Sequence, residues 1–340
     1  MPARTTRLLT LLVALLASAG PTLTAGCAAS TPSSSPPVAT GSVADGPWSF
    51  TDDLGKTVTL DHRPATVVAL TDVAVSMLAY GVRPAGVFGR TNLDTDQRFT
   101  GFDVAGITDV DASYGDIDLE KLAAMAPDLI VTQGYPSKTG GAVDGSAPLY
   151  GFADLAQQDK VAKIAPIVTI AIVGNGARVI ERTADLIVAL GASADAGPLA
   201  DGKRAYDAAT AKLTAAAANG VTVQTMYAEA GNVYVAKAGD DPTLTLYASL
   251  GLRFVEPKTK NYYWDIVSWE DYDSIGGDLV LYSPEGFDKA RLMKQPTFAA
   301  TPAAKAGQVH PWLSTAMDYV TQAAYVDQLA GWVSAAKPLS

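Results

Sequence analysis

The stretch YGDIDLEKLAAMAPDLIV, from Tyr114 to Val131, is echoed 150 positions later by WDIVSWEDYDSIGGDLVL, from Trp264 to Leu281. In both stretches an aromatic residue is followed six positions later by a glutamate, and eight positions after that by an aspartate that opens an apolar run. This order predicts a loop, a helix and a buried strand in each case. Few residues are identical between the two stretches, so the repeat alone is weak evidence for a shared fold.

The two stretches carry the same helix and strand signals. Asp118 and Ser268 stand where a helix N-cap belongs, and the glutamates Glu120 and Glu270 fall in the first helical turn. The Val, Ile and Leu runs after the two aspartates are typical of parallel strands buried on both faces. We therefore expect each stretch to form one α/β unit.

The composition excludes several classes of protein. The 340 residues are 48% hydrophobic and 18% charged, which is ordinary for a globular chain of one or two domains and argues against disorder over most of it. There are 25 basic against 35 acidic residues and no basic stripe, so we expect no nucleic-acid partner. One cysteine and two separated histidines, His62 and His310, are too few for a zinc site. Any metal must arrive already chelated or bind to oxygens.

Residues 1–26 have the parts of a secretory signal. Two arginines precede an apolar run from Leu8 to Ala19, which is shorter than the ~20 residues that a membrane-spanning helix needs. Small residues then lead into Cys27, as in a bacterial lipobox in which the cysteine is lipidated and becomes the mature N-terminus. Thr24 stands where an aliphatic residue is usual, and the alternative is an ordinary signal peptide followed by an incidental free cysteine.

Residues 27–46 then combine the cysteine with a segment rich in Ser, Pro, Ala and Gly, which is typical of a flexible tether. Such a linker would hold a folded body within roughly 25 Å of a membrane. We therefore expect an extracytoplasmic protein that is anchored to the cell membrane by lipidated Cys27 and does not span it.

The rest of the chain alternates predicted strands and helices, with one helical interruption. A hairpin over 48–60 opens the folded part, and βα alternation continues to residue 174. A helix over 175–191 ends at Gly191, a second helix covers 194–219, and the alternation restarts after Gly220. The remaining strands are expected at 66–70, 85–88, 128–132, within 161–172, 221–228, 233–236, near 254, 279–283 and 308–310, and the remaining helices at 73–80, 119–125, in the second part of 137–160, 242–250 and 318–336. This predicts two α/β lobes, 47–174 and 192–340, with a helical joint at 175–191.

The chain resembles the substrate-binding lipoproteins of ABC importers for iron-siderophores, haem and cobalamin. The resemblance covers nearly the whole mature chain, and the stretches that carry it are TDDLGKTVTL and RPATVVAL (51–70), LAYGVRPAGVFG (78–89), DLEKLAAMAPDLIV (118–131), KIAPIV (163–168), VSWEDYDSIGGDLVLYS (267–283) and PAAKAGQVHPW (302–312). It implies two Rossmann-like lobes bridged by a single rigid helix, with the ligand held in the cleft between the lobes.

The resemblance also implies roles for two glutamates. In that family one glutamate on each lobe pairs with arginines of the membrane permease, and the matching positions are Glu120 and Glu270. Two exposed carboxylates would fix the orientation of docking, because bidentate Arg–carboxylate pairs are directional. The alternative for either residue alone is that Glu is favoured in a first helical turn.

Aromatic residues are the candidates for the ligand cleft. Tyr114 and Tyr135 match pocket positions of the family, and Tyr262, Tyr263, Trp264 and Trp312 stand near the second glutamate or the last strand. Aromatic faces with polar rims suit a bulky amphipathic chelate, although ordinary packing explains each one singly. Arg90, after the second strand of the first lobe, could meet an anionic metal centre or be a solvated surface arginine.

The function we expect is a monomeric carrier that captures a ferric siderophore, hydroxamate-like in type, and delivers it to an ABC permease with its ATPase. No enzymatic activity and no cofactor are expected. A cobalamin or haem carrier is the alternative within the family, and haem is disfavoured because neither histidine lies in a convincing pocket loop. From other classes, an anchored hydrolase is opposed by the lack of a Gly-x-Ser-x-Gly elbow, and an adhesin or sensor is not excluded.

Overall fold

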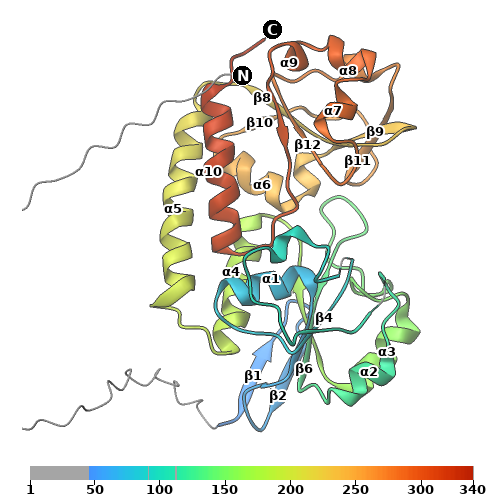
Figure 1. Cartoon of the computed structure of the whole chain (residues 1–340), viewed down its shortest axis with the longest axis vertical. Coiled ribbons are helices and arrows are strands. Elements are labelled where there is room, and N and C mark those ends of the chain that lie inside the picture. The colour runs from blue at the N-terminus through green and yellow to red at the C-terminus, as the bar shows by residue number, and fades with distance from the viewer. Residues whose placement is uncertain (1–45, 91, 112, 340) are drawn as a thin grey trace, which may run out of the picture. The chain divides into compact units, whose positions relative to one another are not determined.

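The structure is a computed structural model that describes residues 46–90, 92–111 and 113–339, all within one compact unit (Figure 1). The predicted signal segment 1–26, the lipidation site Cys27 and all of the tether but Gly46 lie outside the described residues. In the described part of the chain, no helix is long and apolar enough to cross a bilayer.

The first sheet has five parallel strands in the order β5-β4-β3-β6-β7. They are β3 (Val67–Leu70), β4 (Gly86–Phe88), β5 (Thr108–Asp109), β6 (Leu129–Gly134) and β7 (Ile167–Ala171), and the helices α1 (Thr71–Ala79), α2 (Leu119–Ala124) and α3 (Leu155–Ile164) connect them. Every residue of β3, β4 and β6 is buried, as expected for strands covered on both faces. The strand order reverses between β3 and β6, where open α/β sheets bind their ligands.

The N-terminal hairpin closes one edge of this sheet. It consists of β1 (Trp48–Thr51) and β2 (Thr57–Leu60), and its turn lies against β7. Asp52 accepts the N–H of Thr169 (3.3 Å), and Asp53 accepts the N–H of Ala171 (2.9 Å) and the Nε of Arg182 (2.7 Å). The hairpin therefore provides partners for backbone groups that an uncovered edge strand would present to other chains.

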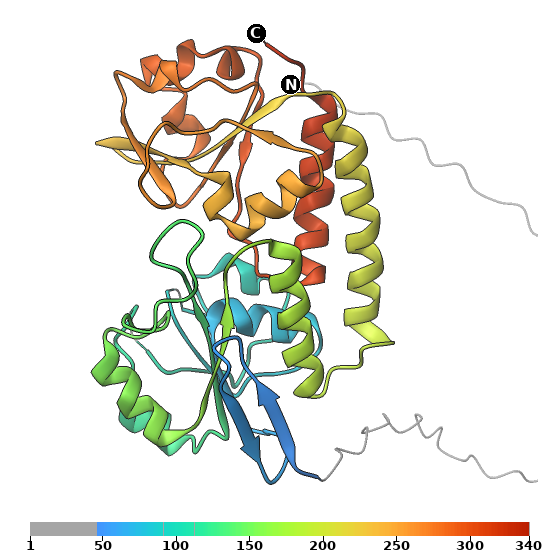
Figure 2. The same cartoon turned by 180° about the vertical axis from the view of Figure 1, so that it is seen from behind.

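Two consecutive helices connect the sheets. α4 (Gly176–Ala189) is the helix expected over 175–191, and the 21-residue α5 (Gly197–Ala217) follows it. Figures 1 and 2 show α5 lying alongside α10 (Tyr319–Ala335) and leading to the second sheet. The predicted fold of two α/β lobes with a helical bridge is confirmed. The prediction that one helix at 175–191 forms the bridge is wrong, because α4 ends at Ala189 and the longer α5 follows it as the long helix of the bridge. The lobe limits at 174 and 191 stay predictions.

The second sheet is mixed. Its order is β11-β9-β8-β12-β13, with β10 also paired to β8, and the strands β8, β10, β12 and β13 are parallel while β9 and β11 run antiparallel to their neighbours. The strands are β8 (Thr222–Ala228), β9 (Asn232–Ala236), β10 (Arg253–Phe254), β11 (Trp264–Ser268), β12 (Leu279–Tyr282) and β13 (Val309–Pro311). The helix α6 (Pro242–Ser249) lies between β9 and β10 in the chain.

The first of the two similar stretches folds as predicted. Asp118 caps α2 by accepting the N–H of Lys121 (2.9 Å), Glu120 lies in the first turn, and β6 follows.

The prediction for the second stretch is wrong before its final strand. Trp264–Ser268 is strand β11 instead of a loop, and only the 3-10 turn η3 (Tyr272–Ser274) stands in place of a helix. Ser268 therefore caps no α-helix, and Glu270 lies in the turn between β11 and η3. Ile266 and Val267 favour extended backbone and pair with β9, and two successive glycines with positive φ, Gly276 (77°) and Gly277 (114°), leave little room for a helix.

Smaller differences concern helices. Residues 161–164 belong to α3 and are not a strand. Five short elements have no signal in the sequence pattern: the 3-10 turns η1 (Gln97–Phe99) and η2 (Ala238–Asp240) and the short helices α7 (Lys289–Leu292), α8 (Pro296–Ala300) and α9 (Pro302–Lys305). Each has at most five residues, too few for a 3.6-residue period to be visible.

Candidate functional site

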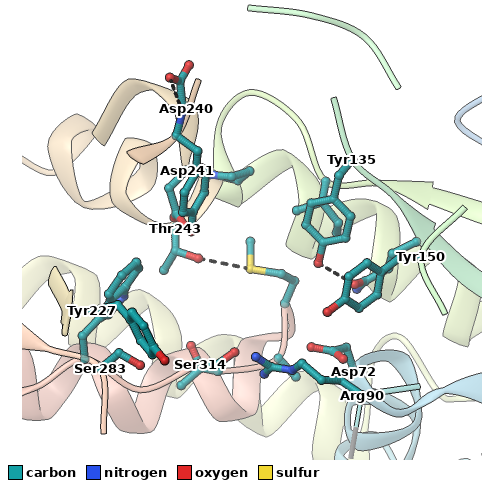
Figure 3. Close-up of a pocket in the computed structure, with 18 of the residues that line it drawn as sticks. Asp72, Arg90, Tyr135, Tyr150, Tyr227, Asp240, Asp241, Thr243, Ser283 and Ser314 are labelled. Carbon is teal, nitrogen blue, oxygen red and sulfur yellow. Dashed lines mark hydrogen bonds between the residues drawn. The ribbon is translucent and has the colours of Figure 1, made fainter. Parts of the chain in front are cut away.

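A cavity of about 460 Å³ is lined by residues from both halves of the fold (Figure 3). That size is within the ordinary range for a small-molecule site, about 300–1,000 Å³. Most of the lining residues lie at the ends of strands or in the segments that directly follow them. Most of the others come from the segment between β13 and α10. The lining residues are Asp72, Arg90, Gln133, Tyr135, Pro136, Tyr150, Ile172, Tyr227, Asp240, Asp241, Pro242, Thr243, Tyr262, Tyr263, Trp264, Ser283, Glu285, Trp312, Leu313, Ser314, Thr315, Ala316 and Met317.

On the first-sheet side, tyrosines form the wall. Tyr135 and Tyr150 pack with ring centroids 5.1 Å apart, and Figure 3 shows Asp72 and Arg90 near them. Tyr114, predicted as a ligand contact, does not line the cavity; its ring packs behind Tyr150 at 5.2 Å. Its hydroxyl also accepts the N–H of Gly151 at 3.4 Å. Tyr114 therefore supports a cavity residue.

On the second-sheet side, the predicted aromatics Tyr262, Tyr263, Trp264 and Trp312 all line the cavity. Trp264 contacts Tyr263 (4.7 Å between centroids) and Trp312 (6.3 Å), both edge-to-face. Such edge-to-face arrangements of aromatic rings are favourable. The cavity thus has an aromatic wall that also carries indole N–H and phenol O–H groups.

Tyr263 is held in an unusual conformation. Its φ of 64° is in the left-handed region, which costs a bulky residue about 1–2 kcal/mol. Its N–H donates to Asp240 (3.1 Å), its hydroxyl donates to Asp241 (2.5 Å), and its carbonyl accepts the N–H of Lys237 (2.8 Å). Burial raises the pKa of the Tyr263 hydroxyl well above its usual value, and the Asp241 charge raises it further, so this group remains a donor. Three hydrogen bonds therefore offset the backbone strain and fix the ring in the cavity wall.

The charged groups of the cavity are paired. Arg90 lines the cavity and donates twice to Glu285 (2.6 and 3.0 Å), so a carboxylate from the other half of the fold holds its guanidinium, and its contact with a ligand stays a prediction. Asp72 pairs with Arg98 at 2.6 Å. Asp240 pairs with Lys237 at 3.1 Å and accepts from Thr139 at 3.0 Å, and Thr139 belongs to the loop after β6.

Nothing in the described residues fits a metal centre built by the protein: no group of three or more His, Cys, Asp or Glu side chains could hold an ion there. His62 lies 3.5 Å from Asp128 and His310 stacks on Trp332 (4.7 Å between centroids), and neither lines the cavity. Burial, with a contribution from the Lys289 charge, lowers the pKa of His310.

Several cavity residues were missed by the sequence analysis. Asp72 is the second residue after β3, Gln133 is in the last part of β6, and Ser283 and Glu285 follow β12. Their position is a signal that could have indicated them, because ligands of α/β proteins bind at the carboxyl ends of the parallel strands. Tyr150 and the segment 313–317 lack such a signal, because long irregular segments bring them to the site.

The two predicted docking glutamates lie outside the cavity lining, and both are exposed. Glu120 is in the first turn of α2, and Glu270 is in a turn of the other sheet. Their role at a permease stays a prediction.

Two α/β halves that enclose a cavity at their strand ends are the architecture of a substrate-binding protein. Residues 67–314 match the sequence profile of the Periplasmic binding protein family, and the chain belongs to that family. Its role is therefore that of a substrate-binding protein. No curated protein matches the chain.

Solved structures agree with this assignment. DesE, a ferric-siderophore receptor protein from Streptomyces coelicolor, is 31% identical, with a TM-score of 0.77 over 86% of this chain and 100% of that one. The siderophore periplasmic binding protein from the fuscachelin gene cluster of Thermobifida fusca is 21% identical (TM-score 0.56; 79% and 96% covered). The catecholate-siderophore binding protein VctP from Vibrio cholerae is 16% identical (TM-score 0.59; 85% and 99% covered). The last two support the fold alone.

Proposed function

We propose that this protein captures a ferric siderophore in the aromatic cavity and delivers it to an ABC permease. The observation that carries the proposal is the cavity itself: its size, its wall of tyrosines and tryptophans, and the polar side chains in its lining fit a bulky chelate with an apolar surface and exposed oxygens. The 31% identity to DesE over that whole chain supports the same ligand class. The iron would be cargo enclosed by its chelator, so the protein needs no metal ligands of its own.

The test is a binding titration of the purified body, residues 47–340, followed by tryptophan emission. Trp264 and Trp312 line the cavity, so a bound ferric chelate should quench their fluorescence. The panel consists of ferric hydroxamate and catecholate siderophores, haemin and cobalamin. Saturable binding of at least one ferric siderophore, tighter than haemin and cobalamin, is the expected result. Binding of haemin or cobalamin alone would reassign the cargo, and no binding of any compound would refute the proposed siderophore function.

We further propose that the body is extracytoplasmic and anchored by a lipid on Cys27. The family membership supports the location, and the sequence before Cys27 supports the anchor. In cells, Cys27→Ala should move the protein from the membrane fraction to the soluble fraction. An unchanged membrane fraction would contradict the anchor.

A further inference from the structure

The cavity lining contains more carboxylates than cations. Within the described residues, Arg90 is the one basic side chain in the lining, against Asp72, Asp240, Asp241 and Glu285. Burial raises the pKa of Asp241, and this carboxyl accepts the Tyr263 hydroxyl.

The bases around the cavity are already engaged with these acids. Arg98 pairs with Asp72, and Lys237 pairs with Asp240. A negatively charged ligand would therefore have to compete with the protein's own carboxylates for every cation near it.

Arg90 is the base that a ligand could reach, and Glu285 occupies it. The two side chains come from segments 195 residues apart, after β4 and after β12, and they form a bidentate pair at 2.6 and 3.0 Å. Bidentate geometry uses two donors of the guanidinium and is the strongest form of this contact. Burial alone would lower the pKa of Arg90, but the Glu285 charge raises it. The Arg90 side chain is 37% exposed and the Glu285 side chain 46% exposed, so a ligand in the cavity can compete with Glu285 for Arg90.

The backbone holds both partners in place. Arg90 follows Gly89, whose N–H donates to Asp111 at 2.7 Å and whose φ of 143° and approach to Thr71 leave no room for a side chain. Glu285 precedes Gly286, where a Cβ would come within 2.3 Å of the Ala228 carbonyl oxygen. The next residue, Phe287, donates its N–H to the same carbonyl at 2.8 Å. The ion pair thus joins two segments with fixed backbones.

We propose that Glu285 is a specificity-determining residue: by occupying Arg90 it makes the cavity accept ferric chelates of positive or zero net charge and discriminate against anionic ones. This inference rests on the proposed siderophore function. An anionic chelate must displace Glu285 and then lie beside the Asp72 and Asp240 carboxylates, whereas a cationic chelate meets a lining that is already acidic.

The experiment compares three ferric chelates of similar size: a tris-hydroxamate with a free ammonium group, a neutral tris-hydroxamate and a trianionic tris-catecholate. The wild-type protein should bind the first two more tightly than the third. Glu285→Gln should tighten the anionic chelate by about fivefold or more, because Arg90 then becomes available, and should leave the neutral chelate within about twofold. The gain should shrink as salt is raised, since the pair is half exposed.

Glu181→Gln is the matched control. Glu181 is an exposed glutamate in an ion pair with Arg178 (3.6 Å) on α4, so its loss changes the net charge equally without touching the cavity. It should alter none of the three affinities. Arg90→Gln in the wild-type background should weaken the anionic chelate further and spare the cationic one. Thermal melting of each variant checks the fold.

The outcomes separate this inference from the proposed function. If chelates bind but Glu285→Gln changes all three affinities by the same factor, Glu285 only holds the two halves of the site together, and the selectivity role is refuted. A wild-type preference for the anionic chelate also refutes it while leaving the siderophore function intact. If no chelate binds, both proposals fail.

Discussion

At the scale of single residues, Trp264 connects the packing of the cavity wall to a measurable signal. Its ring contacts Tyr263, Trp312 and Tyr234 within 4.7–6.3 Å, and it lines the cavity. Trp264→Ala should weaken the bound chelate by about fivefold to tenfold, equivalent to about 1–1.5 kcal/mol, because one aromatic face is lost. Trp264→Phe should keep most of the affinity and remove much of the fluorescence quench. Both are measured by titration.

Trp332→Phe is the control for this measurement. Trp332 stacks on His310 and is not among the cavity residues, so its replacement should lower the total emission and leave the quench by ligand unchanged. Equal quenching in wild type and in Trp264→Phe would show that Trp264 does not contact the ligand, and would leave Trp312 as the tryptophan that reports binding.

Asp111 is a second residue with a measurable effect, because it holds Gly89 next to Arg90. Burial, together with the nearby Asp109 charge, raises the pKa of Asp111 to about 6, although the Gly89 N–H opposes the shift. Its Oδ1 atom is buried without a hydrogen-bond partner in the described part of the chain. A raised carboxyl pKa means that the native state binds the proton more tightly than the unfolded state does. The Asp111 contribution therefore reduces the free energy of unfolding as pH rises from about 4 to about 6, and it is constant above that.

Asp111→Asn removes this titration and keeps an acceptor for Gly89. The Tm of the variant minus the Tm of the wild type should increase as pH rises from about 4 to about 6, whatever its value at low pH. The measurement is thermal unfolding at a series of pH values. A difference that stays constant across this range would show that Asp111 ionises as it does in the unfolded chain.

At the scale of elements, the N-terminal hairpin stabilises the first sheet by covering its edge. Asp53→Ala would leave the Ala171 N–H and the Arg182 guanidinium without this carboxylate, so the free energy of unfolding should fall by about 1–3 kcal/mol. Asp185→Ala is the matched control, because it removes an exposed partner of the same arginine at 3.3 Å and should cost at most about 1 kcal/mol. Urea unfolding measures both. Equal effects would mean that the edge contact adds no stability.

The two similar stretches show which elements the sequence can predict. In both stretches an aspartate precedes the final strand and accepts backbone hydrogen bonds from other segments. Asp128 accepts the N–H groups of Ala65 and Thr66, and Asp278 accepts those of Thr222 and Leu339. The apolar runs that follow were predictable because burial on both faces leaves a continuous pattern. The segment Trp264–Ser268 was not, since its strand depends on pairing with β9 rather than on its own periodicity.

At the scale of the whole molecule, the site was predictable only in part. The aromatics Tyr135, Tyr262, Tyr263, Trp264 and Trp312 line the cavity, and their positions were predictable because Tyr135 matches a pocket position of the family and the others stand near Glu270 or the last strand. Their contact with a ligand stays a prediction. The ion pair of Arg90 with Glu285 could not be found, because 195 residues separate the partners and neither has a local signature. Tertiary folding alone decides whether such a charge is free for a ligand or already paired.

Docking to a permease would involve the whole molecule, through Glu120 and Glu270. Each is exposed, one belongs to each half of the fold, and neither lines the cavity. An exposed carboxylate adds little to folding, but at an interface it must meet its cationic partner, and losing one member of such a pair can cost about 2–5 kcal/mol. Replacing both with Ala should therefore leave chelate affinity within about twofold and abolish uptake, while one replacement should reduce uptake in part.

The matched control removes two other exposed glutamates, Glu181 and Glu256, and should leave uptake unchanged, because it alters net charge equally away from the proposed docking positions. Uptake of the radiolabelled ferric chelate is measured in a strain that lacks its native carrier, and chelate affinity is measured on the purified variants. Normal uptake by Glu120→Ala/Glu270→Ala would refute the docking role. Lost chelate binding in that variant would instead assign the two carboxylates to the cavity or to its support, since a docking residue has no part in holding the ligand.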